Sequence, residues 1–590
     1  MKTKQIIYLM TIMGLLAIAS CKKESLLNQS PPTALSQASY WHTASDLQNY
    51  ANNFYNFSDV FPLYTSFSSL GIYSVDDNSD NMVPQTPSAR LNGQYTVASN
   101  STYADWTEIY DVNYFLANYT KVNATASSVA PYVGEAYFFR AMLYFNGVIT
   151  SGALPWINRP LNVTDTAFIY SPRLSRTVVV DSIINDLNKA IANLPTKSAA
   201  QSQRVYKEYA EGYLARVCLY EGTWEKYHAN DVFGVAGQNG AAFLQLAATT
   251  ANTVITSGVY QLDNVGAANG YFNLFNQSSY TSSKEVMFWG AFNTQTGIVT
   301  YWQNYFQFGS TGTNNDGLSK ALVDDYLCTD GNPTSLSPLY QGDDSLAHIF
   351  ANRDPRLRQS VFYYGDQVVT NGPPSAPTVL FTYPSLVGGY ACTTGFQIRK
   401  GLNTTYGQSS GNGLGGTDGV IYMRYAEILL IYAEARAELG LATQSDIDMT
   451  INKLRDRVGM PHLNIAAIPT DPKWAFPSLS PLINEIRRER RIELACEGYR
   501  LNDIFRWAAA PTLIVGKQPL GAMVKQFLTV VPTLVVGTNI YVNAQGYIEP
   551  YAKVTSMAAG YQFNVNRDYL YPLPLQQITI NPKITQNPGW

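Results

Sequence analysis

Apolar residues recur at helical spacing along much of the chain. In the segment 180–194, apolar side chains follow one another three or four residues apart until Pro195 ends the run, which is the pattern of an amphipathic helix. Tyrosines repeat this spacing at 206–220, and the segments 134–145 and 241–255 have a similar character. The sequence therefore predicts helix pairs stacked as in tetratricopeptide arrays, although it has no strict repeat of about 34 residues.

Long stretches without periodicity separate the predicted helices, at 61–101, 293–317, 363–386 and 401–419. Loops of more than about 15 residues are usually functional or disordered. The segment 512–551 is rich in β-branched residues and predicts a few strands. We therefore expect a mainly α protein with tetratricopeptide-like repeats, long irregular loops and a few short β-strands. Its N-terminal region (21–284) and C-terminal region (285–590) are expected to form one integrated unit.

A predicted helix that begins near Ser480 carries charges on its apolar face. Its apolar residues define one arc at about 100° per residue, and Arg490, Glu493 and Glu497 project inside that arc. Several like charges lie four residues apart on this helix, so pairs within it cannot stabilise it. We therefore expect its charged partners to come from another part of the chain.

A second predicted helix, at 424–440, supplies acidic candidates for that pairing. It is apolar nearly all round except for Glu427, Glu434 and Glu438, which line one narrow stripe. We expect some of the arginines to meet this stripe in a structural ion-pair network. Removing one partner of a buried pair typically costs about 3 to 5 kcal/mol, so such pairs would fix a single packing arrangement.

The N-terminus has the pattern of a secretory signal. Lys2 and Lys4 precede an apolar run at 6–19. As a helix this run covers about 21 Å, which is shorter than the hydrocarbon core of about 30 Å. The residues before Cys21 resemble a bacterial lipobox, so we expect 1–20 to be a lipoprotein signal peptide and Cys21 to receive the lipid. An ordinary signal peptide with an incidental cysteine is the alternative.

Composition excludes some classes of partner and favours others. With 40 Lys and Arg against 43 Asp and Glu, the formal charge of -3 is too balanced for a protein that binds nucleic acid or anionic lipid. Charged residues make up only 14% of the chain, while Tyr alone contributes 42 residues. A polar but mostly uncharged surface suits neutral, hydroxyl-rich ligands, although tyrosines are also common in well-packed cores.

Cysteine and histidine spacing offers no cofactor site. The four cysteines after Cys21 are scattered without a C-x-x-C pair, and the four histidines are isolated, so neither a disulfide framework nor a zinc site is predicted. We expect no cofactor and no metal bound through these residues. A structural calcium held by loop oxygens would escape this test and stays open.

Two enzyme motifs occur in a glycine- and serine-rich loop. Gly407–Gly411 matches G-x-S-x-G around Ser409, and Gly411, Gly413 and Gly416 match G-x-G-x-x-G. A nucleophile elbow needs a strand directly before the serine and a helix directly after it, and neither is predicted here. We therefore interpret both matches as chance products of loop composition and expect no catalytic residue. Paired aspartates elsewhere are interpreted as solvated loop acids.

Several blocks in order make the chain resemble the SusD/RagB family of outer-membrane lipoproteins. The C-terminal blocks read "RYAEILLIYAEARAELG", "INKLRDRVGMP", "LINEIRRERRIELACEGYRLNDIFRW" and "YLYPLPLQQITINPKITQNPGW". The N-terminal blocks read "WTEIYDVNYFLANY" and "GEAYFFRAMLYFNGVITSGALPWI". The resemblance implies a helical, non-enzymatic lid on a SusC-like TonB-dependent outer-membrane transporter. It also implies a lipid-anchored protein that faces the cell surface and hands glycans, or in some branches peptides, to that transporter.

Two loops carry the aromatic and planar polar side chains that a glycan site needs. The ligand candidates of the first loop and its continuation are Tyr73, Asp76, Asp77, Asp80, Asn81, Arg90 and Tyr95. Those of the second are Trp289, Tyr301, Trp302, Asn304 and Tyr305. Glycan binding is the preferred function, a peptide-binding lid of the same architecture is the alternative, and a lipid-anchored hydrolase acting through Ser409 is a third.

Overall fold

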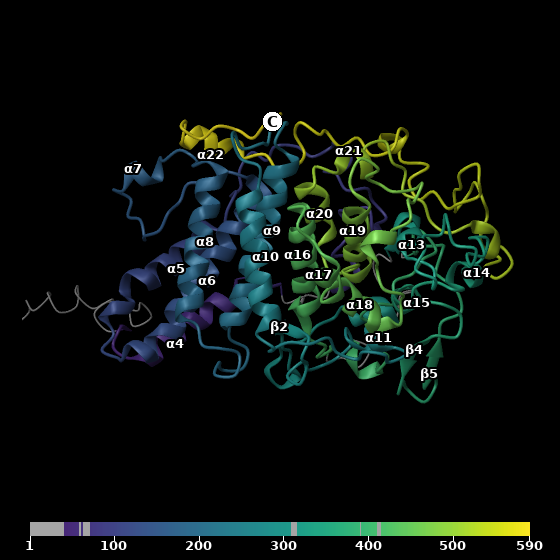
Figure 1. Ribbon diagram of the computed structural model, residues 1–590, viewed down its shortest axis with the longest axis horizontal. Coiled ribbons are helices and arrows are strands. Elements are labelled where there is room, and N and C mark those ends of the chain that lie inside the picture. The colour runs from purple at the N-terminus through teal and green to yellow at the C-terminus, as the bar shows by residue number, and fades with distance from the viewer. Residues whose placement is uncertain (1–39, 58–60, 63–70, 308–315, 390, 410–414) are drawn as a thin grey trace, which may run out of the picture.

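The computed structural model describes residues 40–57, 61–62, 71–307, 316–389, 391–409 and 415–590. The predicted signal peptide at 1–20 and the lipid-attachment candidate Cys21 lie outside this part of the chain. In the part that is described, no helix is long and apolar enough to cross a membrane. The architecture is mainly helical, as the sequence predicts (Figure 1).

The longest helices form a continuous array at the left and centre of Figure 1. They are α5 (Trp106–Asn118), α6 (Ala126–Ser151), α8 (Arg176–Asn193), α9 (Lys207–Tyr227), α10 (Ala241–Thr256), α16 (Tyr425–Glu438) and α19 (Pro481–Glu493). α6 packs against α5 and α8, and α9 packs against α8 and α10. α16 then joins α10 to α19, so the array runs from the N-terminal region into the C-terminal region.

Local sequence sets where these helices begin and end. Thr125 caps α6 by accepting a hydrogen bond from the Ser128 N–H (3.3 Å), and Gly152 follows the helix with a φ of 76°. Such a left-handed φ favours glycine. α8 ends at the residue before Leu194, where Pro195 cannot continue a helix. The predicted helices at 134–145, 180–194, 206–220 and 241–255 are confirmed as parts of α6, α8, α9 and α10.

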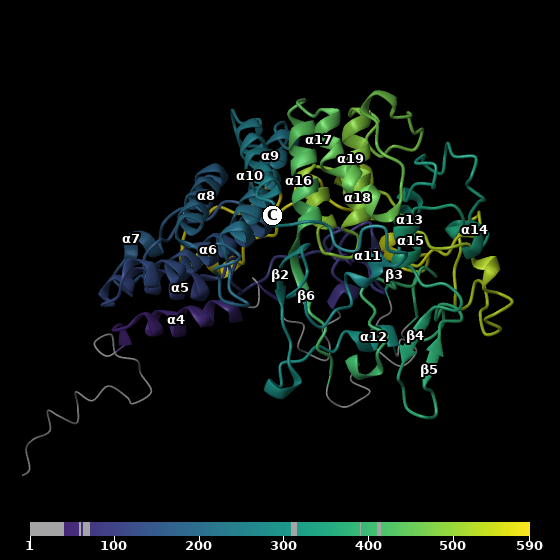
Figure 2. The same ribbon diagram turned by 60° about the horizontal axis from the view of Figure 1, so that its bottom comes forward.

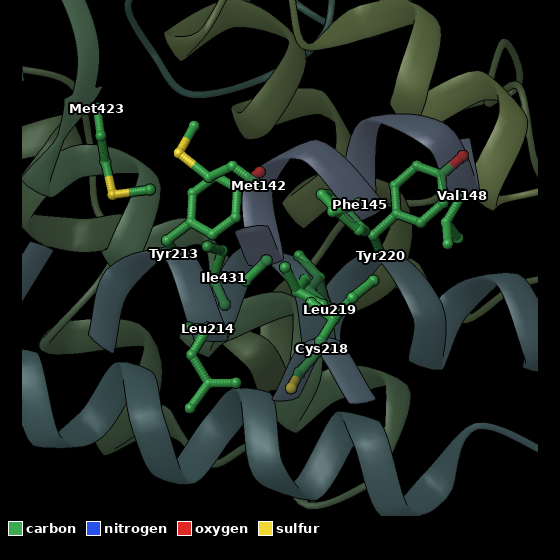
Figure 3. Close-up of a cluster of buried hydrophobic side chains, with 14 of the residues drawn as sticks. Met142, Phe145, Val148, Tyr213, Leu214, Cys218, Leu219, Tyr220, Met423 and Ile431 are labelled. Carbon is green, nitrogen blue, oxygen red and sulfur yellow. The ribbon is translucent and has the colours of Figure 1, made fainter. Parts of the chain in front are cut away.

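A single hydrophobic cluster runs through the helical array and contains residues from Trp41 to Ile584. Figure 3 shows its centre, where Phe145 of α6 faces Tyr220 of α9, with Ile431 of α16 nearby. Because this cluster draws on both the N-terminal and the C-terminal region, the two regions share a core.

Helices α9 and α10 approach each other closely at two glycines. A Cβ atom on Gly240 would collide with the Gly222 carbonyl oxygen, and one on Gly222 would lie 2.8 Å from the Leu244 Cγ atom. Gly240 also has a φ of 74° directly before α10 begins. Both the close contact and the left-handed backbone require glycine at this turn.

Shorter elements fill the space around the array. The shorter helices are α4 (Ala44–Asn52), α7 (Thr166–Ile169), α11 (Gly270–Asn273), α12 (Gln303–Gln307), α13 (Lys320–Asp325), α14 (Leu346–Phe350), α15 (Pro355–Ser360), α17 (Gln444–Asp448), α18 (Ile451–Val458), α20 (Arg500–Arg506), α21 (Ala510–Leu513) and α22 (Leu575–Ile580). The antiparallel strand pairs are β1 (Met82–Val83) with β3 (Gly317–Leu318), β2 (Val286–Gly290) with β6 (Val420–Arg424), and β4 (Gln367–Thr370) with β5 (Thr378–Leu380). Figure 2 shows β2 and β6 below α16, and β4 and β5 at the lower right beside α12.

The prediction of strands within 512–551 is wrong. This segment contains turns, the end of α21 and isolated bridges such as the one between Met523 and Tyr547, but no strand. Its apolar side chains, among them Val531 and Leu534, are buried in a second hydrophobic cluster. Irregular backbone therefore buries the residues whose β-branched character suggested strands.

The charged helix α19 begins where the sequence predicts and ends earlier than its pattern suggests. Ser480 accepts a hydrogen bond from the Ile483 N–H (3.3 Å) and Pro481 occupies the first turn. The helix ends at Glu493, and Cys496 (φ 63°) and Gly498 (φ 82°) then turn the chain. Glu497 therefore lies in the turn between α19 and α20.

Candidate functional site

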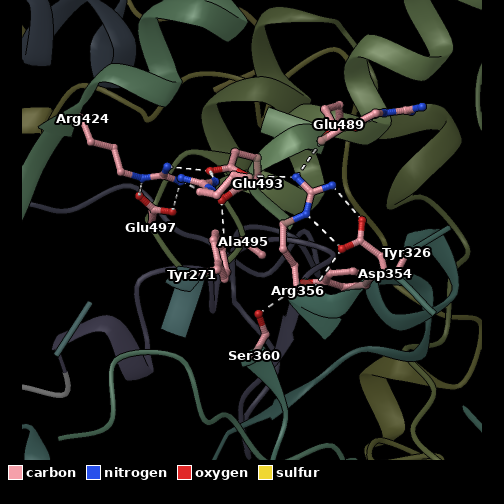
Figure 4. Close-up of polar contacts among 12 residues, drawn as sticks. Tyr271, Tyr326, Asp354, Arg356, Ser360, Arg424, Glu489, Glu493, Ala495 and Glu497 are labelled. Carbon is pink, nitrogen blue, oxygen red and sulfur yellow. Dashed lines mark hydrogen bonds and ion pairs between the residues drawn. The ribbon is translucent and has the colours of Figure 1, made fainter. Parts of the chain in front are cut away.

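Glu493, the last residue of α19, is the centre of a buried ion-pair cluster (Figure 4). Its Oε1 accepts hydrogen bonds from Arg424 (2.6 Å) and Arg457, and its Oε2 accepts one from Arg356 (2.9 Å). All four side chains are at most 1% exposed. Burial alone would raise the pKa of Glu493, but Arg457, Arg424 and Arg356 together hold it well below its usual range.

The cluster joins segments that are far apart in the sequence. Arg356 also binds Asp354 (2.7 Å) and Glu489 (2.6 Å), while Arg424 binds Glu497 (2.7 Å). Arg424 ends β6 and precedes α16 directly. Because β6 pairs with β2, these ion pairs fix the position of the strand that carries Trp289.

The acidic stripe of α16 is paired along its length. Glu427 accepts a bidentate pair of hydrogen bonds from Arg216 (both 2.7 Å), and Glu438 binds Lys226 at 2.7 Å and the α19 residue Arg487 at 3.3 Å. Arginines of α19 therefore do reach this stripe.

Glu434 has its main partner on α20 rather than on α19. Arg506 contacts both of its oxygens (2.5 and 2.8 Å), and Trp507 donates its indole N–H at 2.7 Å. Arg490 lies 3.9 Å from Glu434 and binds Asp503 more closely, at 2.8 Å. Burial would raise the pKa of Glu434, but Arg506 and the neighbouring arginines lower it to about 2.

Most polar candidates of the first loop are used inside the protein. Asp76 and Asn81 are 2% and 1% exposed, and the Asn81 amide donates to Asp76 at 3.0 Å. Asp80 binds Arg500 at 2.6 Å and Arg491 at 2.9 Å. Asp76 accepts hydrogen bonds from the Cys496 and Gly498 N–H groups, and Asn81 accepts one from Arg491. The three residues therefore attach the loop to α19, α20 and the turn between them, which corrects the expectation that they form an open polar rim.

Arg90 and Tyr95 do not join the first loop in one cleft. Arg90 is 6% exposed and donates to the backbone carbonyls of Asp568 (2.7 Å) and Tyr569 (2.8 Å). Tyr95 is 36% exposed and lies against Tyr571, near the C-terminus. The backbone of Tyr73 belongs to a short 3₁₀ helix at Gly71–Tyr73.

Asp77 forms a carboxyl–carboxylate pair with Asp316. Burial and the charge of Asp76 raise the pKa of Asp77 to about 7, although its hydrogen bond with Asp316 acts in the opposite direction. Burial, together with the charge of Asp77 and the hydrogen bond with it, raises the pKa of Asp316 to about 9. At neutral pH the pair therefore holds at least one proton. Asp77 is therefore paired with Asp316 and is not the solvated loop acid that the sequence suggests.

The second predicted loop is only partly exposed. Trp302 directly precedes α12 and Tyr305 lies on it; they are 3% and 2% exposed, and Asn304 between them is 8% exposed. Trp302 and Tyr305 belong to the second hydrophobic cluster. Their expected role as surface platforms is therefore corrected, because both rings are core residues, while Tyr301 and Trp289 remain half-buried.

Trp289 of β2 lines a cavity of about 150 Å³ between β2 and the loop that joins α8 to α9. Its indole packs edge-on against Tyr280, with ring centroids 5.5 Å apart. The lining also includes Gln201, Ser202 and Gln203, all of which are exposed, and the charged residues Lys197 and Arg204 of the same loop. An indole facing neutral amides and hydroxyls can hold a sugar ring through its apolar face and its hydroxyl groups.

Gly419 has no side chain and so leaves room for the Trp289 indole beside the cavity. A Cβ atom there would lie 2.7 Å from the Trp289 ring and 3.0 Å from the Tyr280 ring. The backbone of Gly419 is held by a hydrogen bond to the Gln277 carbonyl (2.9 Å). The indole is therefore fixed before any ligand binds.

The sequence analysis did not identify Tyr280 or residues 201–203 as part of the cavity lining. Neither segment has an aromatic cluster or a motif, and both reach Trp289 only through the packing of α9 against β2 and β6. The position of Tyr280 nine residues before Trp289 follows neither strand nor helix spacing. No local signal could have placed these groups together.

The hydrolase motif does not present a nucleophile. Ser409 is 0% exposed, and its hydroxyl donates to the Tyr406 carbonyl at 3.0 Å. A 3₁₀ turn at Tyr406–Gln408 precedes it in place of a strand. Part of the second match, at 410–414, lies outside the described residues. Within the described part of the chain, no group of three or more His, Cys, Asp or Glu residues could hold a metal ion.

Relatives of known name match nearly the whole chain. SusD-like protein P2 of Formosa agariphila is 25% identical over 590 residues, which cover 98% of each protein. SusD-like protein P38 of the same organism is 24% identical over 84% of this chain and 90% of its own length.

Solved structures share the fold. A SusD-like carbohydrate binding protein from Bacteroides fragilis is 21% identical and superposes with a TM-score of 0.70 over 92% of this chain and 100% of its own. A laminarin binding SusD-like protein is 19% identical, with a TM-score of 0.55 over 93% of this chain and 100% of its own.

Two family models cover most of the sequence between them. A model described as starch-binding associating with outer membrane matches residues 27–219. The SusD family model matches residues 273–590, which is more than half of the chain and includes the α16 stripe, α19 and the C-terminal blocks. With the helical array, the ion-pair cluster and these matches in agreement, the chain belongs to the SusD family.

Proposed function

We propose that this protein binds neutral glycans without altering them, and that the cavity beside Trp289 is part of the binding site. The observation that carries this proposal is that a half-buried indole and exposed amide and hydroxyl groups line the same cavity. Family membership supports it, as do two structural neighbours whose names describe them as carbohydrate binding and laminarin binding.

The physical basis is the two-sided chemistry of a sugar ring. Its C–H face packs on an aromatic ring, and its rim of hydroxyls exchanges hydrogen bonds with planar amides. Trp289 offers the first surface, and Gln201 and Gln203 offer the second. The ring is held in place before binding, so little conformational entropy is lost when a ligand arrives.

Isothermal titration with a panel of ligands tests this proposal. The panel contains neutral hexasaccharides of glucose, xylose and mannose, the matching polysaccharides, and unrelated oligopeptides. Truncating a central aromatic anchor typically costs about 2 kcal/mol or more, so Trp289→Ala should weaken glycan binding by about 30-fold. Tyr364→Ala, at a residue that is 73% exposed and distant in sequence from the cavity, is the matched control.

The same titration separates the two classes of ligand. Saturable binding of a saccharide without product formation supports the proposal. Binding of oligopeptides and of no saccharide would replace it with a peptide-binding lid of the same architecture. Unchanged saccharide affinity in Trp289→Ala would remove this cavity from the site.

We further propose that Cys21 carries a lipid anchor at the outer membrane and that the protein delivers its ligand to a SusC-like TonB-dependent transporter. The lipobox-like residues before Cys21 support the anchor, and the family description supports outer-membrane association. Incorporation of a clickable fatty acid should be lost in Cys21→Ser. Affinity purification from detergent-solubilised membranes should recover a large TonB-dependent barrel, and its absence would contradict the delivery role.

A further inference from the structure

A separate cavity of about 470 Å³ lies where the segment 95–105 and the end of α6 meet the C-terminal segment. Its walls include Tyr95, Thr102, Thr150 and Tyr571. Its volume falls within the range of roughly 300 to 1,000 Å³ that small-molecule sites occupy. Figure 1 shows α22, which follows this C-terminal segment, at the top edge of the molecule, whereas β2 with Trp289 lies near the bottom.

Tyr95 offers an aromatic surface at this cavity. Its side chain is 36% exposed, and its ring packs against Tyr571 (centroids 4.9 Å apart) and Trp590 (6.1 Å). The guanidinium of Arg90 lies 3.8 Å from the centre of the Tyr571 ring, and that of Arg567 lies 4.3 Å from the Trp590 ring. The rings are therefore held in a fixed group while one of them stays open to solvent.

Hydrogen bonds between the N-terminal region and the C-terminal segment join the walls of the cavity. The Tyr571 N–H donates to the Thr150 carbonyl at 2.8 Å. The N–H groups of 575 and 576 donate to the carbonyls of 98 and 99, both at 3.0 Å. Because the walls are formed before a ligand binds, binding would lose little entropy in ordering them.

The lining chemistry indicates the class of ligand. Ser101, Thr102, Thr150 and Asn146 contribute hydroxyl and amide groups, and tyrosine and proline rings contribute apolar surface. Among the described residues that line the cavity, Asp105 alone carries a charge. A charged ligand would find no matching set of ion-pair partners here, whereas a neutral, hydroxyl-rich one would find both an aromatic face and hydrogen-bonding groups.

We propose that this cavity is a second saccharide-binding site, with Tyr95 as its stacking platform. The inference rests on the proposed function, because it assumes that the chain binds neutral glycans. The site lies away from Trp289, so the two sites would engage different parts of one polysaccharide. Two linked contacts of this kind raise the avidity for a long chain well above the affinity of either site alone.

The experiment measures the affinities of the same panel of ligands for a set of variants of the full chain. Tyr95→Ala should reduce the apparent affinity for the bound polysaccharide by about tenfold or more, since it removes one of two linked contacts. Tyr95→Phe keeps the ring and should bind within about twofold of the wild type. In Trp289→Ala, residual saccharide binding should persist, and it should disappear in Trp289→Ala combined with Tyr95→Ala.

Ser101→Trp tests the cavity without changing the aromatic group. Ser101 is exposed, so a bulky side chain there can fill the cavity while leaving the core intact. This variant should reproduce the loss seen in Tyr95→Ala, with a melting temperature close to that of the wild type. Tyr364→Ala again serves as the control and should bind normally.

The outcomes separate the two proposals. Saccharide binding that Trp289→Ala abolishes and that Tyr95→Ala and Ser101→Trp leave unchanged would overturn the second site and leave the proposed function standing. Equal losses in Tyr95→Ala and Tyr95→Phe would overturn stacking as its basis. If no saccharide of the panel binds the wild type, both proposals fail.

Discussion

The ion-pair cluster around Glu493 and the aromatic segment at 288–308 are both rich in side chains that bind ligands in other proteins. Around Glu493, the three arginines that could bind an anion are turned inward onto a carboxylate and are almost completely buried. In the aromatic segment, Trp302 is also buried, but Trp289 lines a cavity together with exposed amide and hydroxyl side chains. Residue type alone therefore does not distinguish a structural side chain from a ligand-binding one. The difference is whether the side chain is already paired with other groups inside the protein.

The two regions also have different roles. The Glu493 cluster joins α15, β6 and α19, so it holds the strand pair on which Trp289 sits. A change in the cluster should therefore act through stability, whereas a change at Trp289 should act through binding.

The largest effect is expected from Glu493→Gln. Removing one partner of a buried ion pair typically costs about 3 to 5 kcal/mol, and here three arginines lose the same partner. We expect the free energy of unfolding, measured by urea denaturation, to fall by about 5 kcal/mol or the protein to be recovered only as aggregate.

A matched control for Glu493→Gln is Asp456→Asn in α18. This change also removes a carboxylate from an ion pair, but the pair with His462 is more than half exposed. Exposed pairs contribute about 0 to 1 kcal/mol, so this variant should unfold close to the wild type. Similar losses in both variants would contradict the distinction between buried framework charge and solvated charge.

The next largest effect is expected from Trp302→Ala. Replacing a buried tryptophan by alanine typically costs about 3 to 5 kcal/mol, and Trp302 is 3% exposed. Trp289→Ala should lower the free energy of unfolding by less, because its indole is half-buried and borders a cavity. Urea denaturation of both variants checks this, and a larger loss for Trp289→Ala would show that the two rings have been assigned the wrong roles.

Periodicity made the framework predictable from the sequence. The helices α8 and α10 could be predicted from apolar spacing because each buries one face, whereas α6 and α9 are rich in apolar residues because they are buried nearly all round. The acidic stripe of α16 and the like charges on α19 predicted ion pairs between helices, and these occur, although Arg488 also pairs with Glu485 within α19 at 2.5 Å. Which arginine meets Glu434 was not predictable, since Arg506 approaches through the turn at Cys496 and Gly498.

Exposure of the aromatic residues could not be read from the sequence. Trp302 is buried because Gly71 and Gly401, from distant segments, pack directly against its ring. Trp289 borders a cavity because a space remains between β2 and the loop at 201–203. Both outcomes depend on contacts between segments that are far apart in the sequence, for which a local pattern holds no information.

A smaller effect is expected for the coupling energy between Glu434 and its arginine partners. Neighbouring groups in one ion-pair network show coupling energies of about 0.5 to 3 kcal/mol. A double-mutant cycle of Glu434→Gln with Arg506→Met should give a coupling energy in the upper part of that range, because Arg506 binds both oxygens. The cycle with Arg490→Met should give a smaller one, because Arg490 lies 3.9 Å away. The reverse order would contradict the assignment of Arg506 as the main partner.

The smallest effect concerns the Asp77–Asp316 pair and depends on pH. Its pKa values are raised to about 7 and about 9 in the folded protein, whereas a carboxyl group in an unfolded chain has a pKa of about 4. The folded state therefore binds protons more tightly than the unfolded state. The stabilisation that this pair gives is complete below about pH 4 and is lost as the pH rises through the folded pKa values.

Asp316→Asn should remove this pH dependence. The amide cannot ionise, so the variant avoids placing two negative charges together and should be more stable than the wild type by roughly 1 to 2 kcal/mol at about pH 8. At about pH 5, where the wild-type pair is still protonated, the difference should be small. The exposed Asp344, changed to Asn, should show no such gain, since its side chain is 46% exposed. Equal gains for Asp316→Asn at both pH values, measured by thermal unfolding, would assign the effect to packing and leave the shared proton without a role in stability.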